Sequence, residues 1–174
     1  MKRKIFKSLI TFTLALITFI FSGCIFLAQP KTFTKAGVSI TLTNAFVEKE
    51  YVTMTCYYES PQLVVTLLKE EFTMLSGLED WTLMEYAETT IKGNKLTDSV
   101  AAMSEDGYAY FEYQKELSGN NYSYYATCHK TGDAFWLIQF GCLSKNFDNL
   151  YESILKYAKS ITFDSSTDVP SANV

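Results

Sequence analysis

Apolar and polar residues alternate with a period of two in several short stretches after residue 36, a pattern typical of half-buried β-strands. In Val38–Leu42 the apolar positions are Val38, Ile40 and Leu42, so all three face one side of a strand. Leu63–Leu68 is apolar almost throughout, and so is the longer stretch Ala134–Leu143. Both patterns predict strands buried on both faces. We expect strands at 38–42, 51–58, 63–68, 96–103, 108–115, 122–129 and 134–143.

Three other stretches carry helical signals. Thr82 followed by Glu85 is a capping-box pattern, which predicts a helix running to Ile91. Glu70–Ser76 has room for two helical turns. The last helix is expected to begin at Asn146, because apolar residues recur after it at intervals of three and four. The members of this stripe are Phe147, Leu150, Tyr151, Ile154, Leu155, Ala158 and Ile161.

A turn at Thr131-Gly132 is expected to join the last two strands in a hairpin. The pairing then sets Cys128 opposite Phe135 and Cys142 opposite Asn121, which places the two thiols on opposite faces and excludes a disulfide between them. No CxxC or Cys-His cluster is present, so the cysteines after the N-terminal segment are expected to be small buried hydrophobic residues. They are Cys56, Cys128 and Cys142, and their other pairings stay open.

The order of these elements predicts an α+β fold, in which an antiparallel sheet of about six to seven strands is flanked by helices. About 145 residues follow the N-terminal segment, enough for one domain with its own core but not for two. We place this domain at residues 37–164, after a polar tether at 29–36. Residues 165–174 are expected to form a disordered tail.

Residues 1–28 have the charge and hydropathy of a membrane-directed segment. Four basic residues lie within the first seven positions, and an apolar run from Leu9 to Ala28 follows. At ~1.5 Å rise per residue, this run is long enough to cross a hydrocarbon core of ~30 Å as an uncleaved transmembrane signal anchor. The alternative is a lipoprotein signal peptide, since Phe21–Cys24 resembles a bacterial lipobox and Cys24 is then the lipidated residue. Both predict a membrane-anchored domain on the extracytoplasmic side.

Charge excludes one class of partner. The chain has 15 basic and 19 acidic residues, and four basic but no acidic residues lie within residues 1–28, so the rest carries a net charge of −8. Such a surface repels the phosphates of nucleic acids. We therefore expect no nucleic-acid partner. The expected partners are the membrane, through residues 1–28, and a protein or another component of the cell envelope.

No catalytic, cofactor or metal site is predicted. Ser153–Lys156 and Lys130–Gly132 match the SxxK and KTG patterns of penicillin-recognising enzymes, but in reversed order and in a chain too short for that fold. His129 is the only histidine, and its strand neighbour Cys128 points to the opposite face, so the two cannot act as base and nucleophile. We expect His129 at the surface. Acidic pairs lie at expected helix starts or turns, where acids are favoured without catalysis: Glu70-Glu71, Glu79-Asp80 and Glu105-Asp106.

The layout of the chain resembles that of PsbP-like proteins. Asp133–Phe140, followed by a helix that closes on Ala158–Phe163, resembles the end of that family, and Gly37–Leu42 resembles its opening strand. The resemblance implies an antiparallel sheet sandwiched by helices, in proteins that act without catalysis as binding or assembly modules beside membranes. It carries no functional residue over. The layout is also similar to that of small membrane-anchored proteins of Gram-positive bacteria.

Tyrosines are concentrated on two adjacent expected strands. A core seldom accommodates so many hydroxyl groups, and exposed tyrosines favour binding surfaces. We therefore expect a non-catalytic binding or assembly module with a tyrosine-lined partner surface. Two alternatives remain: a small-molecule-binding lipoprotein with an apolar pocket of ~300 Å³ or more, and a cell-envelope hydrolase that uses two convergent carboxylates. The surface would comprise Tyr108, Tyr110, Tyr113, Tyr122 and Tyr124.

Overall fold

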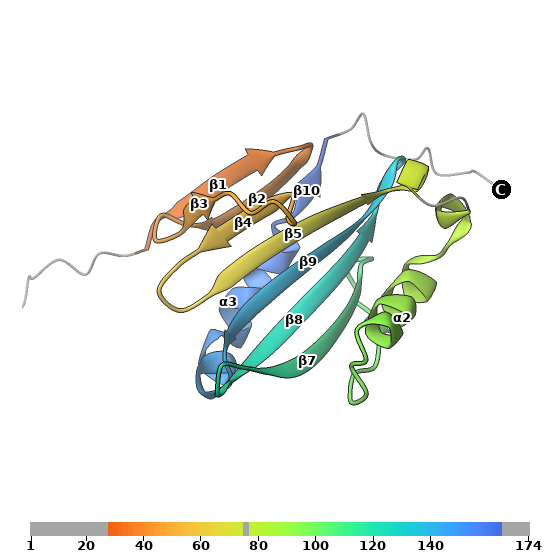
Figure 1. Cartoon of the computed structure of the whole chain (residues 1–174). Coiled ribbons are helices and arrows are strands. Elements are labelled where there is room, and N and C mark those ends of the chain that lie inside the picture. The colour runs from red at the N-terminus through yellow and green to blue at the C-terminus, as the bar shows by residue number, and fades with distance from the viewer. Residues whose placement is uncertain (1–27, 75–76, 165–174) are drawn as a thin grey trace, which may run out of the picture.

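The protein forms two antiparallel sheets and two helices (Figure 1), as seen in a computed structural model that describes residues 28–74 and 77–164. The larger sheet has seven strands in the order β3-β4-β5-β9-β8-β7-β6, and the smaller has three in the order β1-β2-β10. The strands are β1 (Pro30–Lys35), β2 (Val38–Thr43), β3 (Val47–Lys49), β4 (Cys56–Glu59), β5 (Val64–Glu71), β6 (Ala102–Met103), β7 (Ala109–Leu117), β8 (Asn120–Lys130), β9 (Ala134–Leu143) and β10 (Thr162–Phe163). The helices are α2 (Leu83–Gly93) and α3 (Phe147–Lys159), with 3-10 turns η1 (Phe72–Met74), η2 (Leu78–Asp80) and η3 (Ser144–Asn146).

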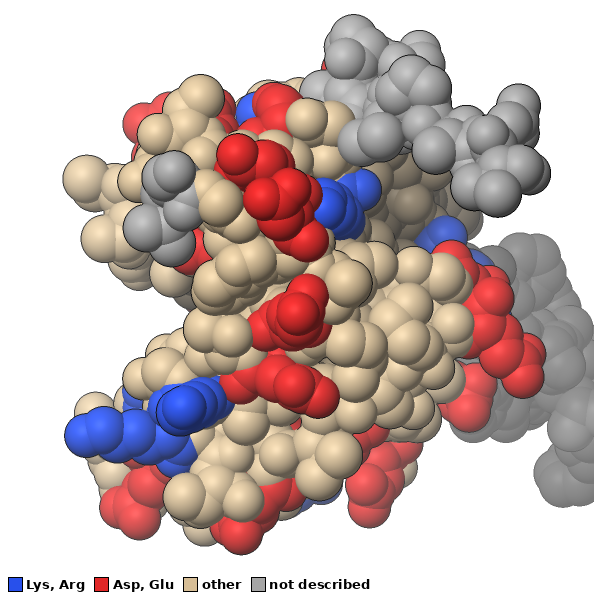
Figure 2. Space-filling view, turned by 90° about the vertical axis from the view of Figure 1, so that its right-hand side faces the viewer, with Lys and Arg blue, Asp and Glu red and all other residues tan. Residues whose placement is uncertain are grey.

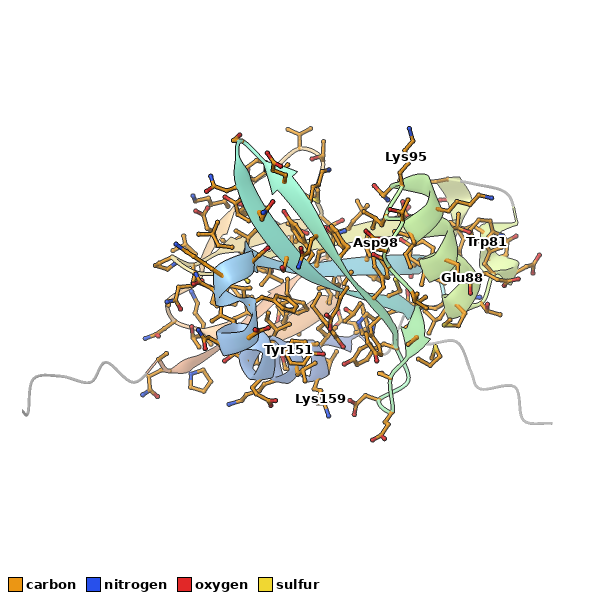
Figure 3. All side chains as sticks on the ribbon, turned by 90° about the horizontal axis from the view of Figure 1, so that it is seen from below. Trp81, Glu88, Lys95, Asp98, Tyr151 and Lys159 are labelled. Atoms are coloured by element: carbon orange, nitrogen blue, oxygen red, sulfur yellow. The ribbon has the colours of Figure 1, made fainter. Side chains whose placement is uncertain are left out.

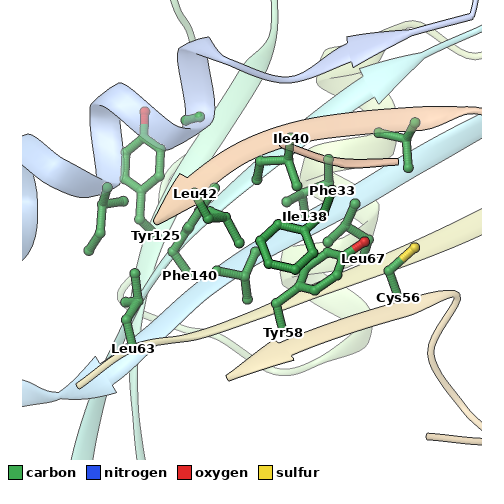
Figure 4. Packing of buried hydrophobic residues seen from close by; sticks show 14 of the residues in the cluster. Phe33, Ile40, Leu42, Cys56, Tyr58, Leu63, Leu67, Tyr125, Ile138 and Phe140 are labelled. Carbon is green, nitrogen blue, oxygen red and sulfur yellow. The ribbon is translucent and has the colours of Figure 1, made fainter. Parts of the chain in front are cut away.

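One face of the seven-stranded sheet is covered by the smaller sheet and α3. Alternate residues of the central strands point into this core, and Leu67, Ile138 and Phe140 are 0% exposed. They pack with Ile40 and Leu42 of β2 (Figure 4). The expected α+β fold, an antiparallel sheet flanked by helices, is confirmed. A second small sheet shares one outer layer with a helix.

The other face is covered in part by α2. The capping box predicted at its start is present: the Thr82 hydroxyl accepts a hydrogen bond from the Glu85 N–H at 3.2 Å, and the Glu85 carboxylate accepts one from the Thr82 N–H at 2.8 Å. These bonds to the charged form lower the pKa of Glu85. Tyr86 and Ala87 bury their side chains. They pack with residues of β7 and β8 that include Ala109, Ala126 and Cys128, whose small side chains allow the helix to lie close to the sheet.

The tether expected at 29–36 is wrong, because residues 30–35 form β1 and pair with β2. Ala36 and Gly37 have φ of 55° and 87° and make a two-residue hairpin turn of the kind that requires left-handed conformations. Phe33 is buried at 7% exposure, with its ring centroid 4.7 Å from that of Tyr58. The domain therefore begins by Pro30 rather than at residue 37. Residues 165–174 lie outside the described part of the chain.

Three expected boundaries in the middle of the chain are also wrong. The strand expected at 51–58 is confined to β4, and the charged turn before it contributes Lys49 to β3, where its ammonium lies 2.5 Å from the Glu59 carboxylate. The helical turns expected from Glu70 begin later, because Glu70 and Glu71 still pair with β9 in the sheet, and of the described residues in this stretch only Phe72–Met74 form a 3-10 turn. The strand expected at 96–103 shrinks to β6.

The hairpin of β8 and β9 forms with a register shifted by two residues. Cys128 lies opposite Leu137 and Cys142 opposite Ser123, because the turn is centred one residue later than expected. The Thr131 N–H and hydroxyl both donate to the Ala134 carbonyl, at 2.9 and 3.2 Å, and close the turn. A register shift of two residues leaves each side chain on the face of the sheet that was expected for it. The prediction that the two thiols lie on opposite faces is confirmed. The three cysteines after the N-terminal segment are buried and free.

The pairing of β1 predicts a stability effect in a segment that looks like a linker. Phe33→Ala should lower the free energy of unfolding by about 3 kcal/mol, the usual cost of removing a buried phenyl ring. Thr34→Ala, one residue further and exposed, should change it by less than about 0.5 kcal/mol. Equilibrium denaturation measures both. Equal small effects would mean that residues 30–35 do not belong to the folded domain.

Candidate functional site

A groove remains on the α2 face of the large sheet, because α2 contacts β7 and β8 but leaves part of β5 and β9 uncovered. The groove has a volume of about 910 Å³. Its floor is formed by Val64, Thr66 and Leu68 of β5 with Gln139 and Gly141 of β9. The β5 residues are only partly buried, so the expectation that this strand is buried on both faces is wrong. In Figure 2 the side of the molecule that carries α2 is hollowed at its left edge.

A pair of stacked tyrosines forms one wall of the groove. The Tyr113 and Tyr124 rings are parallel within 3°, with centroids 4.6 Å apart. Tyr124 leans over Gly141, where an added Cβ would lie 2.5 Å from the tyrosine Cε1. The Tyr124 ring can therefore occupy this position only because residue 141 has no side chain. Burial raises the pKa of both phenols, so both are neutral at physiological pH.

Lys130 fixes the opposite end of the groove. Its ammonium donates to the backbone carbonyls of Glu79 at 2.6 Å and Trp81 at 2.7 Å, and lies 5.3 Å from the centroid of the Phe135 ring. These contacts attach η2 and the start of α2 to the sheet, and Trp81 lines the groove. The KTG lysine thus has a structural role. Ser153 lies on α3, which packs on the opposite face of the sheet from Lys130.

The groove contains one carboxylate. Glu70 accepts a hydrogen bond from the Tyr86 hydroxyl at 2.5 Å, and Tyr86 stacks on Phe135 with centroids 4.3 Å apart. Burial and the carboxylate raise the pKa of Tyr86. Lys115 is the other charged residue among the described ones that line the groove. Two convergent acids, which the hydrolase alternative requires, are therefore not found in this groove.

The remaining acidic pairs do not contribute to the groove. Glu71 lies 3.4 Å from the Lys69 ammonium, and Asp106 lies 3.2 Å from that of Lys159. Glu79 and Asp80 are the exposed residues of the turn η2. Within residues 28–74 and 77–164, no three His, Cys, Asp or Glu side chains are grouped so that they could hold a metal ion.

The five tyrosines expected to form one surface are divided between the two faces of the sheet. Tyr113, Tyr122 and Tyr124 line the groove. Tyr108 and Tyr110 lie on the face covered by α3. The Tyr110 ring stacks on that of Tyr125 at 5.5 Å, and Tyr125 contacts Tyr151 of α3. Figure 3 shows Trp81 beside α2 and Tyr151 on α3, well apart from each other. The odd spacing of Tyr110 and Tyr113 in one strand already implies this division.

Several groove residues were not anticipated from the sequence. Gln139 is the one strongly polar side chain in the apolar strand β9, and its Oε1 accepts a hydrogen bond from the Thr66 hydroxyl at 3.4 Å. Tyr57 and Trp81 line the groove from β4 and η2. The sequence signals for these groove residues are a single glutamine and a glycine in the otherwise apolar strand β9. They do not show which face of the sheet is uncovered.

The N-terminal segment, residues 1–28, lies almost entirely outside the described residues. Cys24, the expected lipidation site, lies outside the described residues, as does nearly all of the apolar run. Among residues 28–74 and 77–164, no helix is long and apolar enough to span a bilayer.

The expectation that His129 lies at the surface is wrong, because the residue is partly buried on the α3 face. Its ring centroid lies 5.2 Å from that of Tyr108 and 5.4 Å from that of Phe163, and its Nε2 lies 3.0 Å from the Thr127 hydroxyl. Burial lowers the pKa of the imidazole to about 4. Cys128 faces the α2 side, so the two residues point apart as predicted.

The groove geometry predicts the effect of adding one methyl group. Gly141→Ala should displace the Tyr124 ring and lower the free energy of unfolding by about 1–2 kcal/mol, the lower range for overpacking, since a ring can swing aside. Near-UV circular dichroism should report the broken tyrosine stack, and urea unfolding the stability. Gly93→Ala in α2, which meets nothing within 4 Å, is the control and should leave the stack unchanged.

The environment of His129 predicts a pH dependence of stability. The folded pKa of about 4 is below the ordinary value of 6.5, so the unfolded chain binds the proton more readily and stability falls as the pH drops from 6.5 to 4. His129→Phe should remove roughly 1–2 kcal/mol of this fall. Denaturation of both proteins across that range measures it. Parallel curves would show that His129 titrates normally in the folded protein.

No protein-family model and no curated protein sequence matches the chain. Solved structures similar to it include the solution structure of PsbP (CyanoP) from the cyanobacterium Synechocystis sp. PCC 6803, at 10% identity and a TM-score of 0.49, covering 81% of this chain and 96% of that one. The Saccharomyces cerevisiae Ran-binding protein Mog1p is 10% identical, with a TM-score of 0.54 and coverage of 82% and 100%. A protein of Bacteroides thetaiotaomicron is 14% identical, with a TM-score of 0.53 and coverage of 82% and 52%. The likenesses to Mog1p and to the Bacteroides thetaiotaomicron protein show a shared fold.

Proposed function

We propose that this protein is a non-catalytic binding module, anchored to a membrane on the extracytoplasmic side, and that the groove beside α2 is its binding site. The observation that carries the proposal is the open, aromatic-lined groove of about 910 Å³ on an otherwise covered sheet. Ligand sites are usually concave, mostly apolar, ~300–1,000 Å³ in volume and provided with a few polar groups. The groove has each of these properties.

The wall of the groove is organised rather than merely unfilled. The Tyr124 ring is held between Tyr113 and the bare backbone of Gly141, and the backbone of Trp81 is tied to the sheet by Lys130. Fixed aromatic side chains lose little conformational entropy when a partner binds, which favours affinity. The lone carboxylate, Glu70, is engaged by Tyr86, so the groove suits binding better than acid-base chemistry.

The anchoring part of the proposal rests on residues 1–28, with the features of a signal anchor or of a lipoprotein signal peptide modified at Cys24, as in small membrane-anchored proteins of Gram-positive bacteria. Because β1 begins at Pro30, two residues after the apolar run ends, an uncleaved anchor would hold the domain close to the bilayer. Mog1p, which has a similar fold, is by its name a Ran-binding protein. The fold therefore serves protein binding in at least that case.

The proposal is tested by capturing partners from intact cells with crosslinkers. Tyr113→Leu and Tyr124→Leu, which keep apolar volume but remove the ring faces, should each weaken capture about 5- to 30-fold, the usual cost of losing an aromatic hot spot. Tyr110→Leu is the matched control, because this tyrosine is half-buried on the opposite face. Mass spectrometry quantifies the crosslinked species. Equal capture by all three variants would rule out the groove as the site that binds a protein partner.

A second candidate function is the binding of a small molecule by a lipoprotein. The volume of the groove favours it, because about 910 Å³ exceeds the ~300 Å³ that such a ligand requires. In that case the same tyrosines contact the ligand, and the capture of a protein partner is unaffected by their substitution.

A further inference from the structure

Aromatic side chains stand at three separate places around the groove. Tyr113 and Tyr124 form the wall on β7 and β8, and Trp81 stands at the end next to η2. Tyr57 lies on β4, and its ring packs at a tilt of 33° against that of Tyr51, with centroids 4.4 Å apart. Flat aromatic faces that line a groove suit ligands whose own flat faces are built from C–H groups.

Hydrogen-bonding side chains lie between these rings. The Oε1 of Gln139 is engaged by Thr66, while its amide nitrogen has no hydrogen-bond partner among the described residues. Thr89 of α2 and Asn94, which follows the end of this helix, line the facing side. Together these groups offer both donors and acceptors to a ligand that carries hydroxyl or amide groups.

The groove is close to electrically neutral on a strongly acidic domain. Its charged residues among those described are Glu70 and Lys115, which balance each other. The surface around it carries many more acidic than basic side chains in the view of Figure 2. An anionic ligand would be repelled by the net charge of −8, and a cationic one would meet a single carboxylate already bound by Tyr86.

We infer that the groove binds a neutral saccharide chain, by contacts of sugar rings with Trp81 and Tyr124 and by hydrogen bonds to Gln139. This inference rests on the proposed function and specifies its ligand. The volume of about 910 Å³ is near the upper end of the ~300–1,000 Å³ of ligand sites, so more than one sugar ring fits.

Two other neutral ligand classes fit less well. A hydrocarbon chain would leave the Gln139 amide without a partner in an apolar contact, which is unfavourable. An extended peptide gains most when its backbone adds to a sheet edge. The floor of the groove consists of β5 and β9, which are central strands paired on both sides. A peptide there would bind through side chains alone.

The test is a titration of the full chain in lipid nanodiscs with chitotetraose, cellotetraose and maltotetraose. The protein has two tryptophans; Trp136 is buried in the core, so a change in fluorescence reports on Trp81. At least one tetrasaccharide should produce a saturable change. Tyr124→Leu and Gln139→Met should raise its dissociation constant at least tenfold, since each removes one class of contact. Tyr110→Leu and Gln114→Met are the matched controls outside the groove and should leave it unchanged.

The same titration is run with a fatty acid and with an unstructured neutral peptide, and unfolding curves confirm that each variant is folded. Binding of the fatty acid or the peptide that depends on Tyr124, without binding of any tetrasaccharide, would overturn the saccharide inference and leave the proposed function intact. If the Tyr124→Leu variant behaved like the unmodified protein with every probe, and crosslinking in cells were also unchanged, both the saccharide inference and the proposed function would be overturned.

Discussion

The seven-stranded sheet must be covered on both faces, and the two covers differ in extent. On one side α3 and the strands β1, β2 and β10 bury the alternate residues of the central strands completely. On the other side an 11-residue helix, only ~16 Å long at ~1.5 Å per residue, is the main cover. A helix of this length cannot shield a sheet of seven strands, so part of the face stays open. The groove is a direct result of this mismatch.

The position of α2 is decided by small side chains and by one lysine. Ala109, Ala126 and Cys128 leave room for the helix over β7 and β8. Lys130 ties the segment before the helix to the sheet through two backbone carbonyls. Gly141 then provides the space into which Tyr124 leans. Small residues beneath the helix and a missing side chain beside it therefore position both walls of the groove.

The two faces also separate the chemistry of the protein. The α3 face holds a dense aromatic cluster around His129, in which burial keeps the imidazole neutral down to low pH. The α2 face holds the groove, where the Tyr86 hydroxyl engages the one carboxylate. A substitution on the α3 face is thus expected to act on stability, whereas one in the groove acts on binding. The paired controls at Tyr110 and Gln114 use this separation.

The sequence by itself determined the elements whose signals are local: the capping box of Thr82 and Glu85, the stripe of α3, and the hairpin of β8 and β9 with its thiols on opposite faces. It also determined the α+β class, because the periods of two and of three to four alternate along the chain. Weak local signals failed at β1 and β3, where pairing with another strand decides the structure. Only the tertiary structure decided which apolar strand face stays uncovered and which tyrosines line it. The periodicity of a strand shows which of its faces favours burial. The length and position of a helix far along the chain determine which face is actually covered.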